Sequence, residues 1–158
     1  MLKEAEDFWK KYDHLNCYEP DYQCDQIIHT DEYLNEKKLG EILSAVFEQV
    51  TPQYKVSVYG QTLKVDYRIL YEDKEIFVEF NGYRHYTNSK TIERDEILEL
   101  HCSVNDIILI SIPYWIQLNS YTFEQFFGEE IFEKVLKNKK IALTTSYPSG
   151  FINELTHD

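Results

Sequence analysis

The apolar residues of the chain follow two patterns, a helical spacing of three and four residues and short strand-like runs. From Asn35 onward, apolar residues recur at the helical spacing of three and four, at Leu39, Ile42, Leu43, Val46, Phe47 and Val50. Thr51-Pro52 predicts the end of that helix, because the residue before a proline avoids the helical region. Three strand-like runs follow, YKVSVY, TLKVDYRIL and EIFVEF, with turns predicted at Gly60-Gln61 and at Glu72-Asp73-Lys74.

Beyond the third run the pattern returns to helix and then to a buried strand. Residues 82–90 are predicted to form a loop and 91–102 a helix. The continuous apolar run IILISI at 107–112, closed by Pro113, is typical of a strand covered on both faces. A final amphipathic helix is indicated by Phe123, Phe126, Phe127, Ile131, Val135 and Leu136. The order α-β-β-β-α-β-α predicts an α/β fold with a mixed central sheet of about four strands flanked by helices.

The two ends of the chain lack this regularity. Residues 1–33 predict a short helix at about 3–12 and then an irregular segment, and 141–158 show no clear period. We therefore expect an N-terminal arm (1–33), one core that includes the C-terminal helix (34–140), and a tail (141–158). The 158 residues, 43% of them apolar, suffice for one well-filled core.

Composition and charge narrow the function classes. The net charge of −12 argues against a protein that coats nucleic acid through bulk charge, although it does not exclude a small basic surface. No run approaches the ~20 apolar residues of a membrane-spanning helix, and MLKEAEDFWKK lacks the apolar segment of a signal peptide. The three widely spaced cysteines do not suggest a disulfide framework, so a reducing, cytoplasmic location and no membrane partner are expected.

A carboxylate interrupts the apolar run IFVEF. Burying the charge of Glu79 there would cost several kcal/mol without compensation. A turn centred on Glu72-Asp73 places Asp66 opposite Glu79, and Lys64 opposite Asn81. Opposed Cβ atoms lie about 4.5–5.5 Å apart, and like charges there repel unless a cation lies between them. Two carboxylates with a backbone carbonyl beside them therefore predict an oxygen-rich site suited to Mg²⁺ or Mn²⁺.

Each predicted helix next to the hairpin carries a charged residue on its apolar face. Glu36 stands three residues before Leu39, and Arg94 stands three before Ile97 and four before Leu98. Both side chains are therefore predicted to turn inward, toward a polar site between the helices and the hairpin. The simpler alternatives are a first-turn acid favoured by the helix dipole for Glu36 and a helix ion pair for Arg94.

Taken together, these residues resemble a known family. The string Asp66, Glu79, Asn81, Gly82, His85, Arg94, Asp95 and Leu98 is similar to the PD-(D/E)xK nuclease superfamily, and closest to the branch of very-short-patch-repair-like endonucleases. The resemblance covers about residues 34–113 and implies a restriction-endonuclease-like core. It implies Asp66 and Glu79 as metal ligands, with Phe80 contributing its carbonyl oxygen. Glu36 matches the helical glutamate before the core, and His85 and Arg94 match polar positions near the scissile phosphate.

The chain departs from the family pattern at two positions. Val65 precedes Asp66 where many members have proline, and Asn81 occupies the lysine position of the E-x-K motif. Lys64, across from Asn81 in the predicted register, could supply the missing amine from the neighbouring strand. Lys64→Ala should then reduce metal-dependent cleavage.

The resemblance implies metal-assisted hydrolysis of phosphodiester bonds, with DNA as the expected substrate. Lys64 or His85 would orient or deprotonate the attacking water, and Arg94 would stabilise the developing charge. The alternative is a catalytically silent domain of the same fold that serves as a nucleic-acid or protein binding module. Double-strand cleavage would require two sites, and hence a homodimer or a partner protein.

Simpler structural explanations stand beside these assignments. Asp66 and Glu79 could be solvated charges on a half-exposed hairpin, with Lys64 and Arg68 as partners. His85 could be an ordinary surface histidine. A structural Zn²⁺ site is a further alternative, because the N-terminal arm contains His14, Cys17, Cys24 and His29 in the spacing H-x2-C-x6-C-x4-H. Such quartets also arise by chance.

Overall fold

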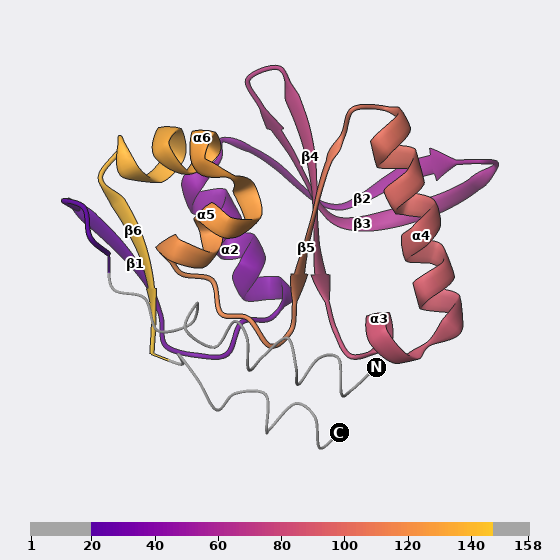
Figure 1. Ribbon diagram of the computed structural model, residues 1–158, viewed down its shortest axis with the longest axis horizontal. Helices are drawn as coiled ribbons and strands as arrows, with labels where there is room; N and C mark the ends of the chain where they lie inside the picture. Colours follow the sequence, from indigo (N-terminus) through magenta and orange to yellow (C-terminus); the bar gives the residue numbers. More distant parts are fainter. Residues whose placement is uncertain (1–19, 147–158) are drawn as a thin grey trace. The chain divides into compact units, whose positions relative to one another are not determined.

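The computed structural model describes residues 20–146, which belong to two compact units (Figure 1). One unit spans Glu36–Pro113. The described part of the other consists of residues 20–35 and 114–146. All the residues of the predicted nuclease-like site lie in the Glu36–Pro113 unit. The predicted boundaries at 33/34 and 140/141 stay predictions.

The Glu36–Pro113 unit is mixed α/β and contains a mixed four-stranded sheet flanked by helices, as the sequence predicts. Its strands have the order β2-β3-β4-β5, with β2, β3 and β4 antiparallel and β5 parallel to β4. The elements in chain order are α2 (Glu36–Val46), β2 (Gln49–Val58), β3 (Gln61–Tyr71), β4 (Lys74–Asn81), α3 (Arg84–Thr87), α4 (Ser89–Val104) and β5 (Ile108–Pro113).

The predicted register of the β3–β4 hairpin is confirmed. Tyr71 pairs with Lys74 and Tyr67 pairs with Val78, so the turn is Glu72-Asp73. The other turn lies one residue earlier than predicted. Its residues are Tyr59 and Gly60, because Val58 pairs with Gln61. Both have positive φ, 49° and 81°, as a two-residue turn of type I′ requires.

The first helix is shorter than its apolar pattern predicts. It ends at Val46, and Val50 and Thr51 belong to β2, where they pair with Ile69 and Arg68. These β-branched residues gain ladder partners in the sheet, which outweighs the helical spacing. Pro52 is tolerated in β2 because this strand lies at the edge of the sheet.

Helix α4 covers the β2–β3 hairpin (Figure 1). Leu98 and Cys102 of α4 pack in one buried cluster with Val58, Leu63, Val65 and Phe77. The helix begins where Asn88 accepts a hydrogen bond from the Thr91 backbone N–H at 3.0 Å. The predicted loop 82–90 is not entirely irregular, because Arg84–Thr87 forms the short helix α3. This arrangement brings Arg94 of α4 into contact with Glu79 of β4 and with the Lys64 backbone of β3.

Helix α2 approaches β3 closely. The Tyr67 hydroxyl donates a 2.6 Å hydrogen bond to the Glu36 carbonyl oxygen. Gly40 leaves room for the Tyr67 ring, since a Cβ atom at position 40 would lie 2.3 Å from the phenolic oxygen. This contact fixes the first turn of α2, and with it Glu36, next to β3.

The other unit contains elements that the sequence pattern missed. β1 (Gln26–Thr30) lies in the segment predicted to be irregular, and β6 (Ile141–Thr145) lies in the predicted tail. The two strands pair in parallel, from Gln26 opposite Ile141 to Thr30 opposite Thr145. Each is five residues long and finds its partner more than a hundred residues away, so neither leaves a local signal.

The predicted single C-terminal helix is divided. Gly128, at a φ of 91°, separates α5 (Ser120–Phe127) from α6 (Glu129–Phe132), which continues as the π-helical turn η2 (Glu133–Lys137). The helix predicted at 3–12 lies outside the described residues. Among residues 20–146, no helix has the length and apolar character needed to cross a membrane.

Candidate functional site

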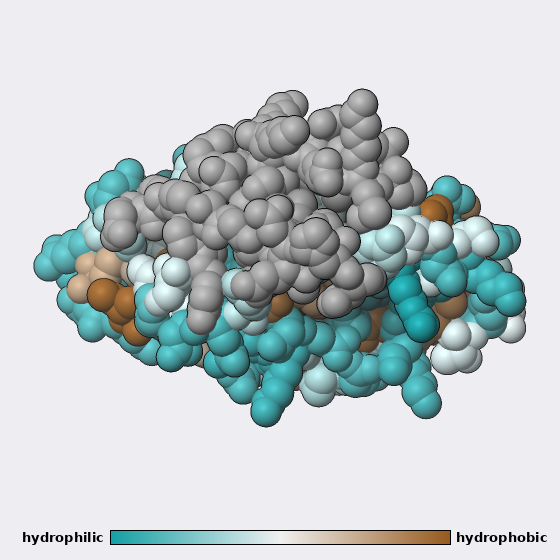
Figure 2. All heavy atoms as spheres, turned by 90° about the horizontal axis from the view of Figure 1, so that it is seen from below, coloured by the Kyte–Doolittle hydropathy of each residue, from teal (hydrophilic) through white to brown (hydrophobic). Residues whose placement is uncertain are grey.

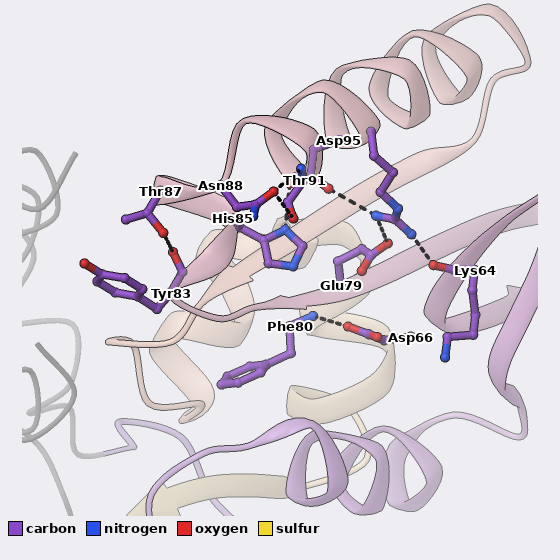
Figure 3. A network of polar contacts seen from close by, with 11 residues as sticks. Lys64, Asp66, Glu79, Phe80, Tyr83, His85, Thr87, Asn88, Thr91 and Asp95 are labelled. Atoms are coloured by element: carbon purple, nitrogen blue, oxygen red, sulfur yellow. Dashed lines mark hydrogen bonds and ion pairs between the residues drawn. The ribbon is translucent and has the colours of Figure 1, made fainter. Parts of the chain in front are cut away.

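The two carboxylates of the predicted pair meet just beyond the end of the β3–β4 ladder. The last paired residues are Tyr67 and Val78, and the next step in the same register brings Asp66 to Glu79. Asp66 accepts a 2.7 Å hydrogen bond from the Phe80 backbone N–H, and its carboxyl group is within hydrogen-bonding reach of Glu79. Glu79 is only 5% exposed, whereas Asp66 is half-buried. Figure 3 shows both side chains where β3 passes β4.

Arg94 of α4 supplies a positive charge that compensates the buried carboxylate of Glu79. Its Nη1 donates to Glu79 Oε1 at 3.0 Å and to Asp95 Oδ1 at 3.1 Å, and its Nη2 donates to the Lys64 carbonyl oxygen. The predicted inward orientation of Arg94 is thus confirmed. The expectation that Glu79 needs an added cation is incomplete, because the protein provides a guanidinium group.

Glu36 brings a third carboxyl group to Asp66 from the first turn of α2. Gln53 donates a 3.2 Å hydrogen bond to Glu36 Oε2, and Asp66 shares a hydrogen bond with the same carboxyl group. That bond, followed by burial and the charge of Asp66, raises the pKa of Glu36 to about 7. Gln53 and the Lys64 ammonium group act in the opposite direction. Glu36 therefore reaches Asp66 from α2, but its side chain is exposed rather than turned into the core.

The pKa of each carboxyl group in the cluster is raised, so the charged forms are disfavoured. Burial is the largest cause that raises the pKa of Asp66, and the neighbouring Glu79 charge adds to it. Burial also raises the pKa of Glu79, although the charge and hydrogen bond of Arg94 partly offset this effect. Carboxyl groups in such a cluster gain from a shared proton or from an added cation.

His85 belongs to the same site through Asp95, a residue of the family-like string to which the sequence analysis assigned no role. Its Nδ1–H donates to Asp95 Oδ2 at 2.6 Å, and the His85 side chain is 18% exposed (Figure 3). Asp95 thereby contacts both His85 and Arg94. Its position beside Arg94 in the sequence was the available signal, whereas nothing local indicated that Gln53 would reach Glu36.

Lys64 and Asn81 do not form the cross-strand pair that the register suggested. The β3–β4 ladder ends before them, and Lys64 pairs instead with Lys55 of β2. Asn81 ends β4 opposite Pro113 of β5 and is half-buried. Lys64 nevertheless lies near enough to Glu36 for its charge to lower the pKa of that carboxyl group. Lys64 therefore lies beside the acidic cluster, as predicted, but it is near Glu36 rather than opposite Asn81.

No ready-made metal centre is present in the described part of the chain. Among residues 20–146, no group of three or more His, Cys, Asp or Glu side chains is arranged so that it could hold a metal ion. Glu79 is turned toward Arg94, while Asp66 contacts Glu36. Magnesium or manganese binding at Asp66 and Glu79, with the Phe80 carbonyl oxygen, stays a prediction.

The zinc alternative also stays a prediction. His14 and Cys17 lie outside the described residues. Cys24 donates its thiol hydrogen to the Tyr22 carbonyl oxygen, and the two ring nitrogens of His29 contact Thr144 and Ser146 hydroxyls at 2.7 Å and 2.8 Å. Zinc binding would require His29 to give up one of these contacts.

Comparisons of the chain with protein-family models, curated proteins and solved structures give no match. The carboxylate cluster and its basic neighbours are therefore the features of the chain that indicate a function.

Proposed function

We propose that the chain is a metal-dependent endonuclease that hydrolyses phosphodiester bonds in DNA, with a core of the PD-(D/E)xK type. One observation carries the proposal. Carboxyl groups from three different elements, Glu36 of α2, Asp66 of β3 and Glu79 of β4, lie so close together that Asp66 influences the pKa of both of the others. Glu36 is exposed, Asp66 is half-buried and Glu79 is buried. A fold gains nothing in stability from such a concentration of acids, so a function is the better reason for it.

The donors are of the chemical type that a hard divalent cation prefers, although the three carboxyl groups are not arranged around one point in the described structure. Oxygen ligands from carboxylates are those that Mg²⁺ and Mn²⁺ prefer, and the raised pKa values of all three groups indicate a site short of positive charge. Asp66, Glu79 and the Phe80 carbonyl oxygen would hold the cation, with Glu36 at its edge. When bound, a cation of this kind polarises phosphate oxygens and lowers the pKa of water. Glu79 would exchange its Arg94 contact for this role.

The basic residues around the cluster have separate tasks in this proposal. His85, oriented by Asp95, accepts a proton from the water whose oxygen attacks phosphorus. Arg94, released from Glu79, and Lys64 place N–H donors beside the negative charge that develops on the phosphate oxygens. The bond from phosphorus to the leaving oxygen then breaks, and that oxygen takes a proton from solvent. Asn81 has no step in this scheme.

A second candidate function has its own supporting observation. The ion pair between Arg94 and Glu79 compensates the buried charge without any added cation. That is what a catalytically silent domain of the same fold, kept as a nucleic-acid or protein binding module, would need. The acidic net charge and Asn81 in place of lysine point in the same direction.

Cleavage assays separate the two candidates. Supercoiled plasmid, single-stranded DNA and RNA would each be incubated with the full chain in Mg²⁺, in Mn²⁺ and in chelator. The proposal predicts metal-dependent nicking of DNA that is lost in Asp66→Asn and Glu79→Gln but retained in Asp73→Asn, an exposed acid in the hairpin turn. Equal activity of Asp66→Asn and the parent would reject it, because the cleavage would then come from elsewhere.

A further inference from the structure

The β2–β3 hairpin differs in charge from the rest of the chain. Residues 49–65, which form β2, the turn and the first half of β3, contain two lysines and no Asp or Glu, within a chain of net charge −12. The acid-free stretch leads directly into Asp66. This segment therefore has a formal charge of +2, from Lys55 and Lys64, and it leads into the carboxylate cluster.

The two lysines of this hairpin lie directly opposite each other. Lys55 of β2 pairs with Lys64 of β3, and both side chains are exposed. Like charges at opposed positions repel and weaken a hairpin, so this pair costs stability in the free protein. A phosphate bound between or above the two ammonium groups would remove the repulsion. The next pair on the same face of the hairpin, two residues closer to the tip, is Ser57 and Thr62, which are exposed and add hydroxyl groups there.

The tip of the hairpin presents an aromatic ring where the backbone disfavours one. Tyr59 is 67% exposed and adopts a φ of 49° at the first turn position, which Asn, Asp and Gly occupy most easily. A large side chain in the left-handed region is strained, and burial offers no compensation to a ring this exposed. An exposed aromatic ring at the end of a basic strand pair is suited to stacking on a nucleotide base.

We propose that the outer face of the β2–β3 hairpin holds the DNA backbone, with Lys55 and Lys64 bound to phosphates and Tyr59 stacked on a base. The inference rests on the proposed function and adds Lys55 and Tyr59 to it. The six residue-to-residue steps from Asp66 back to Gly60 span about 20 Å, roughly six base-pair steps along B-DNA. A strand lying along the hairpin would thus lead from the tip to the carboxylate cluster.

The first test concerns Lys55. A lysine on an edge strand can also serve only to prevent strands of different molecules from pairing, so DNA binding has to be measured directly. Binding would be measured by fluorescence anisotropy with fluorescein-labelled DNA of 20 nucleotides, single-stranded and duplex, in the Asp66→Asn background, which prevents cleavage. Lys55→Ala should make the dependence of log affinity on log salt shallower by about 0.9 for the duplex and 0.7 for the single strand. Lys139→Ala, an exposed lysine with the same charge change, should leave the slope unaltered. Equal slopes for the two variants would overturn the role of Lys55.

A change at Tyr59 separates binding from folding, because the same substitution should keep or raise the stability of the fold and weaken DNA binding. Asn accepts positive φ more readily than Tyr, so Tyr59→Asn should melt at the same temperature as the parent or higher. It should nevertheless bind the single-stranded probe about tenfold more weakly, while Tyr59→Phe binds as the parent does. Unchanged binding by Tyr59→Asn would overturn the stacking role.

The outcomes separate this inference from the nuclease proposal. Weaker binding by Lys55→Ala and Tyr59→Asn, with no cleavage by the parent chain, would support the DNA-holding hairpin and reject the nuclease. Cleavage by the parent with undiminished binding by both variants would reject the hairpin alone. Absence of any binding to either DNA probe would overturn the inference as well.

Discussion

Replacement of Arg94 by methionine tests how Glu79 is tolerated inside the protein. Methionine keeps much of the volume of the arginine stem but removes the donor that contacts Glu79 Oε1 at 3.0 Å. Loss of one partner of a buried ion pair typically costs about 3–5 kcal/mol. We expect a value at the lower end of this range, about 3 kcal/mol at pH 8, because Arg94 is 25% exposed.

The matched change on the other side of the pair should cost less. Glu79→Gln keeps the shape of the side chain and leaves Arg94 bonded to Asp95 and to the Lys64 carbonyl oxygen. Because those acceptors remain, we expect a loss of about 1 kcal/mol. The double variant should lose less than the sum of the two single changes, with a coupling of about 1–2 kcal/mol.

The deficit of the Arg94 variant should depend on pH in a defined direction. Burial raises the pKa of Glu79, and removal of Arg94 takes away the main opposing influence. The folded variant therefore binds a proton that the unfolded chain does not, so its stability falls as pH rises through the folded pKa of Glu79. The deficit against the parent should be larger at pH 8 than at pH 5.

Urea unfolding at both pH values measures these quantities. With a slope of about 2 kcal/mol per molar, a 3 kcal/mol loss moves the midpoint by roughly 1.5 M. A loss below about 1 kcal/mol at pH 8, or a deficit that grows toward pH 5, would refute the assignment of Arg94 as the compensating charge.

Three further predictions address other parts of the site. Glu36→Gln should flatten the decline in melting temperature between pH 5 and pH 8, because the Glu36 pKa of about 7 makes the folded parent lose stability as pH rises through that range; an unchanged profile would contradict it. Gly40→Ala should lower stability by about 1–2 kcal/mol in urea unfolding, since the clash with Tyr67 exceeds the ~1 kcal/mol gain in helix propensity; Ser44→Ala, exposed in the same helix, should be neutral or slightly stabilising. Asp95→Asn and His85→Ala should each slow DNA cleavage about a hundredfold, with little further loss in the double variant; fully additive losses would show that the two residues act separately.

The sheet of the Glu36–Pro113 unit was predictable because its signals are local. The acidic turn at Glu72-Asp73 fixed the β3–β4 register, and alternation along β3 placed Asp66 near Glu79. Helix α4 was predictable from residues within its own length, as was the inward face that carries Arg94. These features depend on neighbours within a hairpin or a few helical turns.

The partners of these residues were not predictable to the same degree. The ion pair between Arg94 and Glu79 depends on how α4 docks on the sheet, which no short pattern encodes. The pairing of β1 with β6 joins segments at the two ends of the described chain, and their short length conceals them. The hairpin also diverges beyond Tyr67, so Lys64 meets Lys55 rather than Asn81. Strand coiling of this kind depends on tertiary packing.

Calorimetric titration with Mn²⁺ tests the central claim that the three carboxyl groups form a divalent-cation site. The account predicts one bound ion per chain in the parent and in Asp73→Asn, with affinity weakened at least tenfold in Asp66→Asn. Arg94→Met should bind the ion more tightly than the parent, because Glu79 would no longer have to leave its ion pair. No heat of binding in the parent and in Arg94→Met, or equal affinity in Asp66→Asn, would contradict the account.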